Sequence, residues 1–336
     1  AFIIIAAGVA FARGRHGDIA TAFESASLRA RFSTKLIAIL FVLSILPLVV
    51  LQTYIFTRFQ SNVIEQSARN LILLAEAKEG HLLSYLSGIK SRAGNFASDG
   101  FIRDTVLRAR GKDMDREERE AFERYLKEDK MALDSRIVGL NIIDNRGIII
   151  ASSAESEVGE DESADDYVTQ ASLLPYGNAF IGSVKIRNHF DKTRRSIVVS
   201  APLFSRDAAR IGVLALHFDV DTLDAILSDA EAAATGARTT LGSRARTLDI
   251  SLVLSDGTAI AQFGMEGDVT LSEVSFIHTK PVRQCAEEKR ESVGEWANHR
   301  GENVIGASMC FPDLEWTLIV EISRAEALES ISSLTR

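Results

Sequence analysis

The sequence has few of the residues and none of the short motifs that usually build catalytic or metal sites. It has two cysteines and six histidines among 336 residues, and the histidines show no ligand spacing. The patterns His-Glu-x-x-His, Cys-x-x-Cys, Gly-x-Ser-x-Gly and the phosphate loop are missing. The serine setting Gly306-Ala307-Ser308-Met309-Cys310 lacks the second glycine. We therefore expect no catalytic residue, no metal and no cofactor.

The sequence also lacks the excess of positive charge that nucleic-acid binding requires. Lys and Arg number 38 against 46 Asp and Glu, for a net charge of −8. No basic stripe with interleaved aromatic residues occurs. An apolar content of 46% and a charged content of 25% are typical of folded globular proteins. We expect no nucleic-acid partner. We expect paired carboxylates such as Asp165-Asp166 to lie on the solvated surface.

Charge is absent from residues 36–56, LIAILFVLSILPLVVLQTYIF. At about 1.5 Å per residue this run is roughly 31 Å long as a helix, close to the bilayer core of about 30 Å. A membrane helix tolerates an internal proline such as Pro47. Tyr54 and Phe56 suit an anchor at the membrane interface. The sequence predicts a transmembrane helix over 36–57; the alternatives are a buried core helix and a cleaved signal peptide.

The charges on either side of this run predict its orientation. Residues 1–35 carry a net charge of +3 and residues 58–336 carry −11. Short basic flanks mark the cytoplasmic end of a membrane helix. We therefore expect residues 1–35 in the cytoplasm and residues 58–336 in the periplasm or outside the cell. The apolar residues 1–12 are too short to span, and the start at Ala1 suggests the tail of an earlier membrane helix or an upstream artefact.

In that oxidising compartment a disulfide between Cys285 and Cys310 is the expected state. It would close a loop of 25 residues. The alternative is two buried free thiols.

The pattern after residue 57 predicts a long helix and then two sets of strands. Apolar residues recur at helical spacing over 58–96 without a proline, so this helix either pairs with a second copy or packs only on its own domain. A charged helical connection follows over 100–131. Strands are predicted over 137–143, 148–152, 180–187, 196–204 and 211–219, and a helix over 220–230.

The second half of the chain repeats this pattern. Strands over 252–254 and 258–263 flank Ser255-Asp256-Gly257, as earlier strands flank Asp144-Asn145-Arg146-Gly147. Residues 304–309 resemble 197–201, and 316–322 with the helix 324–334 resemble 211–219 with its helix. The matched segments are separated by 110, 107 and 105 residues along the chain. These nearly constant offsets predict two copies of one sheet-and-helix unit, joined by segment 228–246, which consists of small and polar residues.

The order of these parts resembles the double Cache family, the tandem PAS-like extracellular sensor domains of bacterial transmembrane receptors. The matching stretches are GLNIIDNRGIIIASS, VGEDESADDY, IVVSAPLFSRDAARIGVLALHFDVDTL, LVLSDGTAI and HRGENVIGASMCFPDLEWTLIVEISRAEAL. In the last stretch the residues that match the family's closing motif are Gly301, Val304, Gly306, Leu314, Trp316 and Glu321. The resemblance covers roughly residues 36 to 336.

The resemblance implies an α+β fold and a dimeric receptor in the bacterial inner membrane. A membrane-distal unit would bind a small solute, and a membrane-proximal unit would transmit the resulting shift to the membrane helices. A second membrane helix and a kinase, diguanylate cyclase or chemoreceptor output are expected beyond Arg336. The expected parts are a cytoplasmic segment 1–35, a transmembrane helix 36–57, a long helix and helical connection 58–136, a distal unit 137–230 and a proximal unit 231–336.

The resemblance also supplies candidate ligand residues. Members that bind amino acids carry a tyrosine, an Arg-x-Trp-Tyr cluster and a strand-end aspartate. Tyr167 and Asp219 match the first and last, but the cluster is absent, so an amino-acid ligand is not supported. Asp219 either receives a cationic group or caps the following helix, and Tyr167 is either a ligand residue or core. Ser196 and Ser200 are further candidates.

Two other functions remain open at this point. A membrane-anchored extracytoplasmic enzyme would need the clustered acid, base or nucleophile that the sequence does not show. A protein-interaction module would need no solute pocket.

Overall fold

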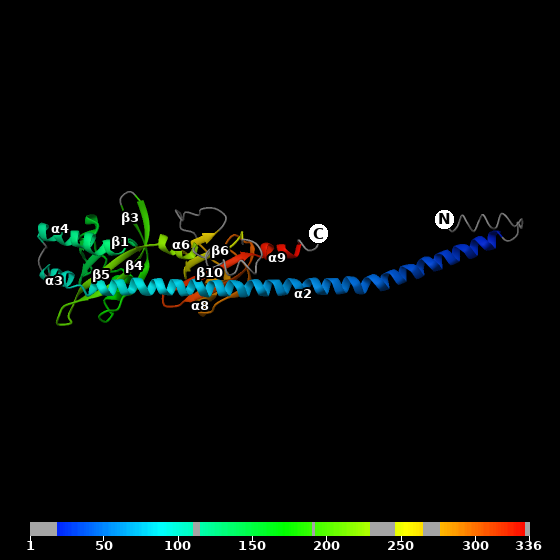
Figure 1. Cartoon of the computed structure of the whole chain (residues 1–336), viewed down its shortest axis with the longest axis horizontal. Helices are drawn as coiled ribbons and strands as arrows, with labels where there is room; N and C mark the ends of the chain where they lie inside the picture. The colour runs from blue at the N-terminus through cyan, green and yellow to red at the C-terminus, as the bar shows by residue number, and fades with distance from the viewer. Residues whose placement is uncertain (1–18, 110–114, 190–191, 229–245, 265–275, 333–336) are drawn as a thin grey trace. The chain divides into compact units, whose positions relative to one another are not determined.

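The computed structural model describes residues 19–109, 115–189, 192–228, 246–264 and 276–332. The chain divides into two compact units, Ala1–Val63 and Ile64–Arg336, which we describe separately. The predicted segment 1–12 and most of the predicted join 228–246 lie outside the described residues. One helix, α2 (Ile19–Ala97), contributes to both units (Figure 1).

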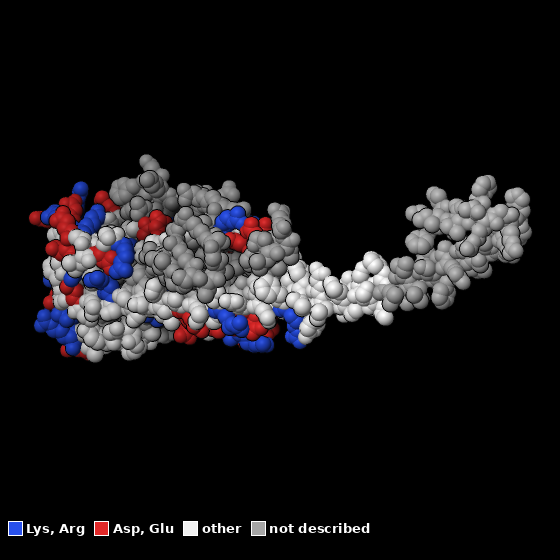
Figure 2. Space-filling model, turned by 45° about the vertical axis from the view of Figure 1, so that its right-hand side comes forward, with Lys and Arg blue, Asp and Glu red and all other residues white. Residues whose placement is uncertain are grey.

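In the first unit, α2 exposes a continuous series of large apolar side chains. Eleven lie between Phe41 and Phe56 and are 40% to 70% exposed, and they form a stretch without charge in Figure 2. The hydroxyl groups there bond within the helix, for example Thr53 Oγ1 to Val49 O at 2.8 Å. Among the described residues, one helix is long and apolar enough to cross a membrane. This helix continues through Pro47.

In the second unit, α2 buries one face. Its buried residues include Leu71, Leu82, Leu86, Ile89 and Phe96, none more than 4% exposed. This spacing matches the helix predicted over 58–96. The chain then forms two shorter helices, α3 (Gly100–Ala109) and α4 (Arg116–Tyr125), followed by short helical turns.

The first lobe is a five-stranded antiparallel sheet in the order β2-β1-β5-β4-β3. Two helices accompany it, α5 (Asp166–Ala171) and α6 (Asp221–Ser228). Its strands are β1 (Ile137–Asp144), β2 (Ile149–Ser152), β3 (Phe180–His189), β4 (Lys192–Phe204) and β5 (Arg210–Asp219).

The second lobe repeats this order as β7-β6-β10-β9-β8. Its helices are α8 (Lys280–Glu288) and α9 (Arg324–Ser332). Its strands are β6 (Asp249–Leu254), β7 (Ala259–Gly264), β8 (Val293–Ala297), β9 (Asn303–Phe311) and β10 (Trp316–Ser323). The predicted α+β class, a long helix followed by two antiparallel-sheet units, is confirmed. The sequence reading missed α8 and β8.

The lobes correspond strand by strand, but two of the predicted offsets are wrong. Ser200 faces α5 and bonds to its backbone, whereas Ala307, at the offset of 107, lies in the core cluster that contains α2. An odd offset moves a side chain to the opposite face of a strand. The pairings of Gly139 with His217 and of Asp249 with Glu321 give the correct correspondence, in which Glu321 takes the place of His217.

The two lobes share a glycine in the first hairpin. Gly147 and Gly257 have φ of +90° and +91°. A Cβ atom at Gly147 would lie 2.4 Å from Cα of Ser163, and one at Gly257 would lie 2.4 Å from the His278 ring. The turn therefore needs glycine for its backbone angle and for space.

We predict that Gly147→Ala lowers the melting temperature more than Gly159→Ala. Gly159 has a similar φ of +94°, but nothing lies within 4 Å of an added Cβ atom. The control thus carries the backbone strain alone, about 1–2 kcal/mol, and the steric clash should add about 1–3 kcal/mol. Thermal unfolding of both variants measures the difference; equal losses would contradict the steric argument.

Candidate functional site

The first lobe has two apolar faces, and they differ in what covers them. Ile197 and Val199 of β4 belong to the cluster that contains α2. Val198 belongs to a second cluster with Tyr167 and Val168 of α5. Because side chains alternate along a strand, Ser196 and Ser200 lie on the α5 side. The candidate site is this α5-covered face.

Tyr167 lies at the centre of the α5-covered face. It is fully buried, and its backbone oxygen accepts a hydrogen bond from Ser200 Oγ at 2.7 Å. A Cβ atom at Gly182 of β3 would lie 2.7 Å from the Tyr167 Cβ, so glycine there lets α5 approach the sheet. The Tyr167 hydroxyl is buried without a hydrogen-bond partner among the described residues. An unsatisfied buried hydroxyl costs about 1–3 kcal/mol, which a bound solute can recover.

A charged pair lies beside this tyrosine. The Lys185 ammonium group is 5.7 Å from the centre of the Tyr167 ring and forms an ion pair with Asp165. Both side chains of the pair are partly exposed. A cation and a carboxylate therefore lie beside the Tyr167 ring, near the start of α5.

Ser196 and Asp219 form a second group on the same face. They are register partners of β4 and β5, and Ser196 Oγ lies 3.3 Å from Nδ1 of the buried His217. Asp219 Oδ1 accepts a hydrogen bond from the backbone N–H of Asp221 at 3.1 Å. Asp221 is the first residue of α6, so Asp219 bonds to an N–H at the start of that helix, while Val220 occupies the cap position.

The structure therefore places the four predicted residues in two groups. Tyr167 and Ser200 are bonded to each other, as are Ser196 and His217. Ser196 and Ser200 are four positions apart on β4, or about 13 Å at roughly 3.3 Å per residue.

A buried polar chain on the same face was missed from the sequence. Asn141 is fully buried in β1, accepts a hydrogen bond from Ser152 Oγ at 2.7 Å and donates to Glu157 Oε2 at 2.9 Å. Buried amides are normally satisfied in this way. The available signal was an asparagine in the apolar strand GLNII.

The lobes are joined by hydrogen bonds to backbone atoms. Arg195 Nη1 donates to the carbonyl oxygens of Ala259 and Ile260 at 3.4 and 3.0 Å. Asp224 Oδ1 accepts from the backbone N–H of Gln262 at 3.1 Å. Burial raises the pKa of Asp224, and the Gln262 N–H and Arg195 partly offset this rise. These bonds connect β4 and α6 of the first lobe to β7 of the second.

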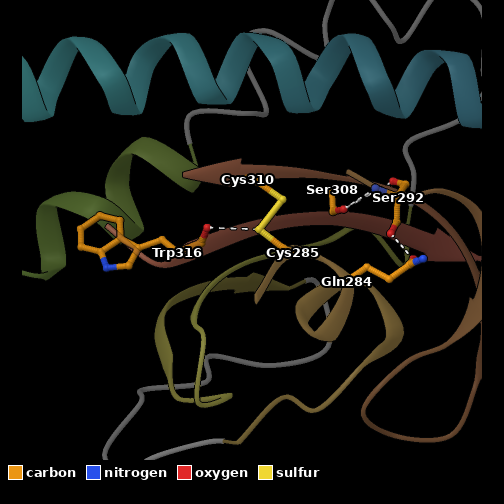
Figure 3. Close-up of a disulfide and its surroundings, with 6 residues drawn as sticks. All are labelled: Gln284, Cys285, Ser292, Ser308, Cys310 and Trp316. Carbon is orange, nitrogen blue, oxygen red and sulfur yellow. Dashed lines mark hydrogen bonds between the residues drawn. A yellow bond between two sulfur atoms is a disulfide. The ribbon is translucent and has the colours of Figure 1, made fainter. Parts of the chain in front are cut away.

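In the second lobe a disulfide links Cys285 of α8 to Cys310 of β9, with their Cα atoms 5.7 Å apart (Figure 3). This separation is usual for a disulfide. Beside the disulfide, Ser292 bonds through its backbone N–H to Ser308 Oγ at 2.9 Å and through its own hydroxyl to Gln284 at 2.6 Å. These contacts fix α8 over the sheet.

Among the described residues no three His, Cys, Asp or Glu side chains gather as a possible metal site.

Comparison with solved structures identifies the fold. The sensor domain of the V. cholerae histidine kinase DctB matches with a TM-score of 0.53 and 13% identity, over 79% of this chain and 98% of its own. The sensory domain of the Campylobacter jejuni chemoreceptor Tlp3 (CcmL), solved with isoleucine bound, matches with a TM-score of 0.52 and 14% identity, over 80% of this chain and 97% of its own. The chain has the double Cache fold.

A third structure agrees with this assignment. The extracellular domain of the putative histidine kinase vpHK1S-Z8 matches with a TM-score of 0.54 and 15% identity, over 80% of this chain and 99% of its own. No protein-family model and no curated protein matches the sequence. The likeness is therefore one of double Cache architecture, and the lobes correspond to a first and a second Cache unit.

We predict that removing the disulfide lowers stability. A closed loop of 25 residues contributes about 3–4 kcal/mol in the chain-entropy model, or roughly 6–16 °C of melting temperature at about 2–4 °C per kcal/mol. Melting of the double variant Cys285→Ser/Cys310→Ser, compared with wild type with and without reductant, tests this. An unchanged wild-type melting temperature in reductant would show that the bond contributes nothing.

Proposed function

We propose that this chain is the ligand-sensing region of a transmembrane signalling receptor, with residues 58–336 outside the cytoplasm. One observation carries the proposal: a single helix, α2, includes an exposed apolar stretch long enough to cross a membrane and then enters the core of a double Cache fold. Figure 2 shows Lys and Arg interspersed with Asp and Glu on the visible face. The first Cache unit binds the solute and the second relays the change.

The α5-covered face of the first Cache unit is the proposed solute site. Tyr167 contributes an unsatisfied hydroxyl, Lys185 and Asp165 contribute opposite charges, and Ser196 with His217 contributes a buried polar pair. The related domain from Tlp3 was solved with isoleucine. The Arg-x-Trp-Tyr cluster is missing here, so we propose a small polar solute other than an α-amino acid.

Signalling requires that the solute binds one state better than another. A ligand shifts an equilibrium only through its differential affinity, and a shift from 1:99 to 99:1 needs about 5.5 kcal/mol. The site lies between β4, β5 and α5, and Arg195 and α6 connect this region to β7 of the second unit. Movement of α5 toward the sheet is thereby transmitted to the second unit and to α9.

We predict that a solute in a panel of amino acids, amines, carboxylates and sugars raises the melting temperature of the full chain in detergent. Binding at 100 times the dissociation constant adds about 2.7 kcal/mol. Tyr167→Phe should stabilise the empty protein, because it removes an unsatisfied hydroxyl, and should weaken binding of that solute about tenfold.

Tyr176→Phe is the matched control, because Tyr176 is 64% exposed in the same unit. This variant should change neither melting temperature nor affinity. Stabilisation by no solute, with capture of a partner protein instead, would favour an interaction module and overturn the sensor proposal. Turnover of a panel compound would favour the enzyme.

We also propose that α2 pairs with its copy in a homodimer. The positions of α2 that point away from both lobes follow a 4-3 spacing and are exposed: Leu73, Ala77, Gly80, Ser84, Ser87 and Ser91. Between them, Ala75, Lys78, Leu82, Tyr85, Leu86 and Ile89 are buried in the chain's own core, and Glu76, His81, Leu83, Gly88 and Lys90 are exposed. Small residues at such positions allow two helices to approach closely.

We predict that Ser84→Cys forms a disulfide-linked dimer under mild oxidation. Its control is Ser255→Cys, which places an equally exposed thiol in the β6–β7 turn. Dimer bands on non-reducing gels should be several-fold stronger for the first variant. Equal bands for the two variants would place the dimer contact elsewhere.

A further inference from the structure

The second Cache unit holds two buried carboxylates that face each other across neighbouring strands. Asp249 of β6 and Glu321 of β10 are register partners, and each residue is only 5% exposed. Both lie on the sheet face away from α2, with Val253 and Ile319. Side chains at such directly opposed positions lie about 4.5–5.5 Å apart at Cβ, so two negative charges there repel.

The two carboxylates have different hydrogen-bond donors. Asp249 Oδ2 accepts a hydrogen bond from Arg300 Nη2 at 2.8 Å, and both its oxygens lie 3.3 Å from Gln262 Nε2. Glu321 Oε2 accepts from the neutral indole N–H of Trp296 at 2.9 Å. Arg300 thus bonds to Asp249 and also lowers the pKa of Glu321, to which the Trp296 indole donates a neutral hydrogen bond.

The position of the indole is built into the sheet. Gly306 of β9 is the register partner of Glu321. A Cβ atom at Gly306 would lie 2.4 Å from the six-membered ring of Trp296. The glycine therefore allows the ring to lie across β9 and to direct its N–H toward Glu321.

Burial raises the pKa of Glu321 to about 7, and the nearby Asp249 charge raises it too, while the Trp296 and Asn298 hydrogen bonds and Arg300 lower it. Burial is the main cause that lowers the pKa of His299, which lies between Asn298 and Arg300 in the β8–β9 turn. A cavity of about 80 Å³ adjoins these groups and is partly open to solvent. Protons therefore have a route to a carboxylate that titrates near neutral pH.

The pair is directly connected to α9. Strand β10 ends at Ser323 and α9 begins at Arg324. Thr247, just before β6, accepts a hydrogen bond from the Ser323 N–H at 2.9 Å and donates to Glu326 of α9. Thr247 and Ser323 both line the cavity. A change in spacing between β6 and β10 at Glu321 therefore acts on the first turn of α9.

We propose that the second Cache unit is itself an input, a proton-responsive switch in which protonation of Glu321 removes its repulsion with Asp249 and changes the junction of β10 with α9. This goes beyond the relay role of that unit in the proposed function. The charged groups around Glu321 are Asp249 from β6 and Arg300 and Glu302 from the β8–β9 turn, in which His299 is the neighbour of Arg300; Glu326 of α9 is connected through Thr247.

The first test follows tryptophan fluorescence of the full chain in detergent between pH 5 and 9. Wild type should show a transition with its midpoint near pH 7, because Trp296 donates to the titrating carboxylate. Glu321→Gln should abolish the transition, and Asp249→Asn should move the midpoint to lower pH. Glu287→Gln, an exposed change on α8, should leave it unchanged. A transition that persists in Glu321→Gln would overturn the proposal.

The raised pKa of Glu321 also predicts how the stability of the chain depends on pH. The folded pKa of Glu321 lies above its ordinary value of 4.5, so the folded state holds this proton more tightly than the unfolded state does. Wild type should therefore lose melting temperature relative to Glu321→Gln as the pH rises from about 4.5 to 7, and no further above that.

The second test measures hydrogen exchange of α9 in wild type and Glu321→Gln at the same pH, which removes the intrinsic effect of pH on exchange. Protection should differ several-fold at pH 8, where only wild type is charged, and should coincide at pH 5.5. Identical exchange at both pH values would contradict coupling to α9. If Glu321→Gln does not fold, the proposal is tested by whether Asp249→Asn moves the midpoint of the fluorescence transition to lower pH. Solute affinity of the first unit is measured separately, so either proposal can fail alone.

Discussion

The structure depends on one hydrophobic seam along α2. A single cluster of buried side chains joins this helix to the sheets of both lobes, including Ile89, Leu216 and Leu318. Each fully buried side chain of this size contributes about 1.5–3 kcal/mol. Inside this seam the buried Lys78 donates to the Ile226 carbonyl of α6 at 2.6 Å. Because cores are close-packed, α2 cannot shift against one lobe without repacking against the other.

The elements with strong periodicity could be predicted from the sequence. The central strands β1, β5 and β10 were placed within a residue or two of their ends, because their apolar runs are long and bounded by turn residues. Strand β8 was missed because it is an edge strand, in which Trp296 is buried while Val293, Glu295 and Ala297 are exposed. The short helix α8 has a proline near its start, Pro281, which reads as a helix end as readily as a helix beginning.

The candidate sites were harder to predict, because they depend on register. The family pattern identified Tyr167 and Asp219 as candidate ligand residues. That the Tyr167 hydroxyl is buried without a hydrogen-bond partner among the described residues could be found only from the packed structure. Glu321 was recognised as part of the closing motif. Its unusual setting comes from Asp249, Trp296 and Arg300, which are far apart in the sequence and meet only when β6, β9 and β10 pair.

The hydrogen bonds at the lobe junction have a consequence for evolution. Arg195, Asp224 and Lys78 all bond to main-chain atoms of their partners. Any amino acid at positions 226, 259 and 260 presents the same carbonyl oxygen, and any residue except proline at 262 presents the same N–H. The partner strand is thus free to drift in sequence while the attachment persists. Such a joint would survive the exchange of the second lobe for another of the same fold, because its bonds require only the main chain of that lobe.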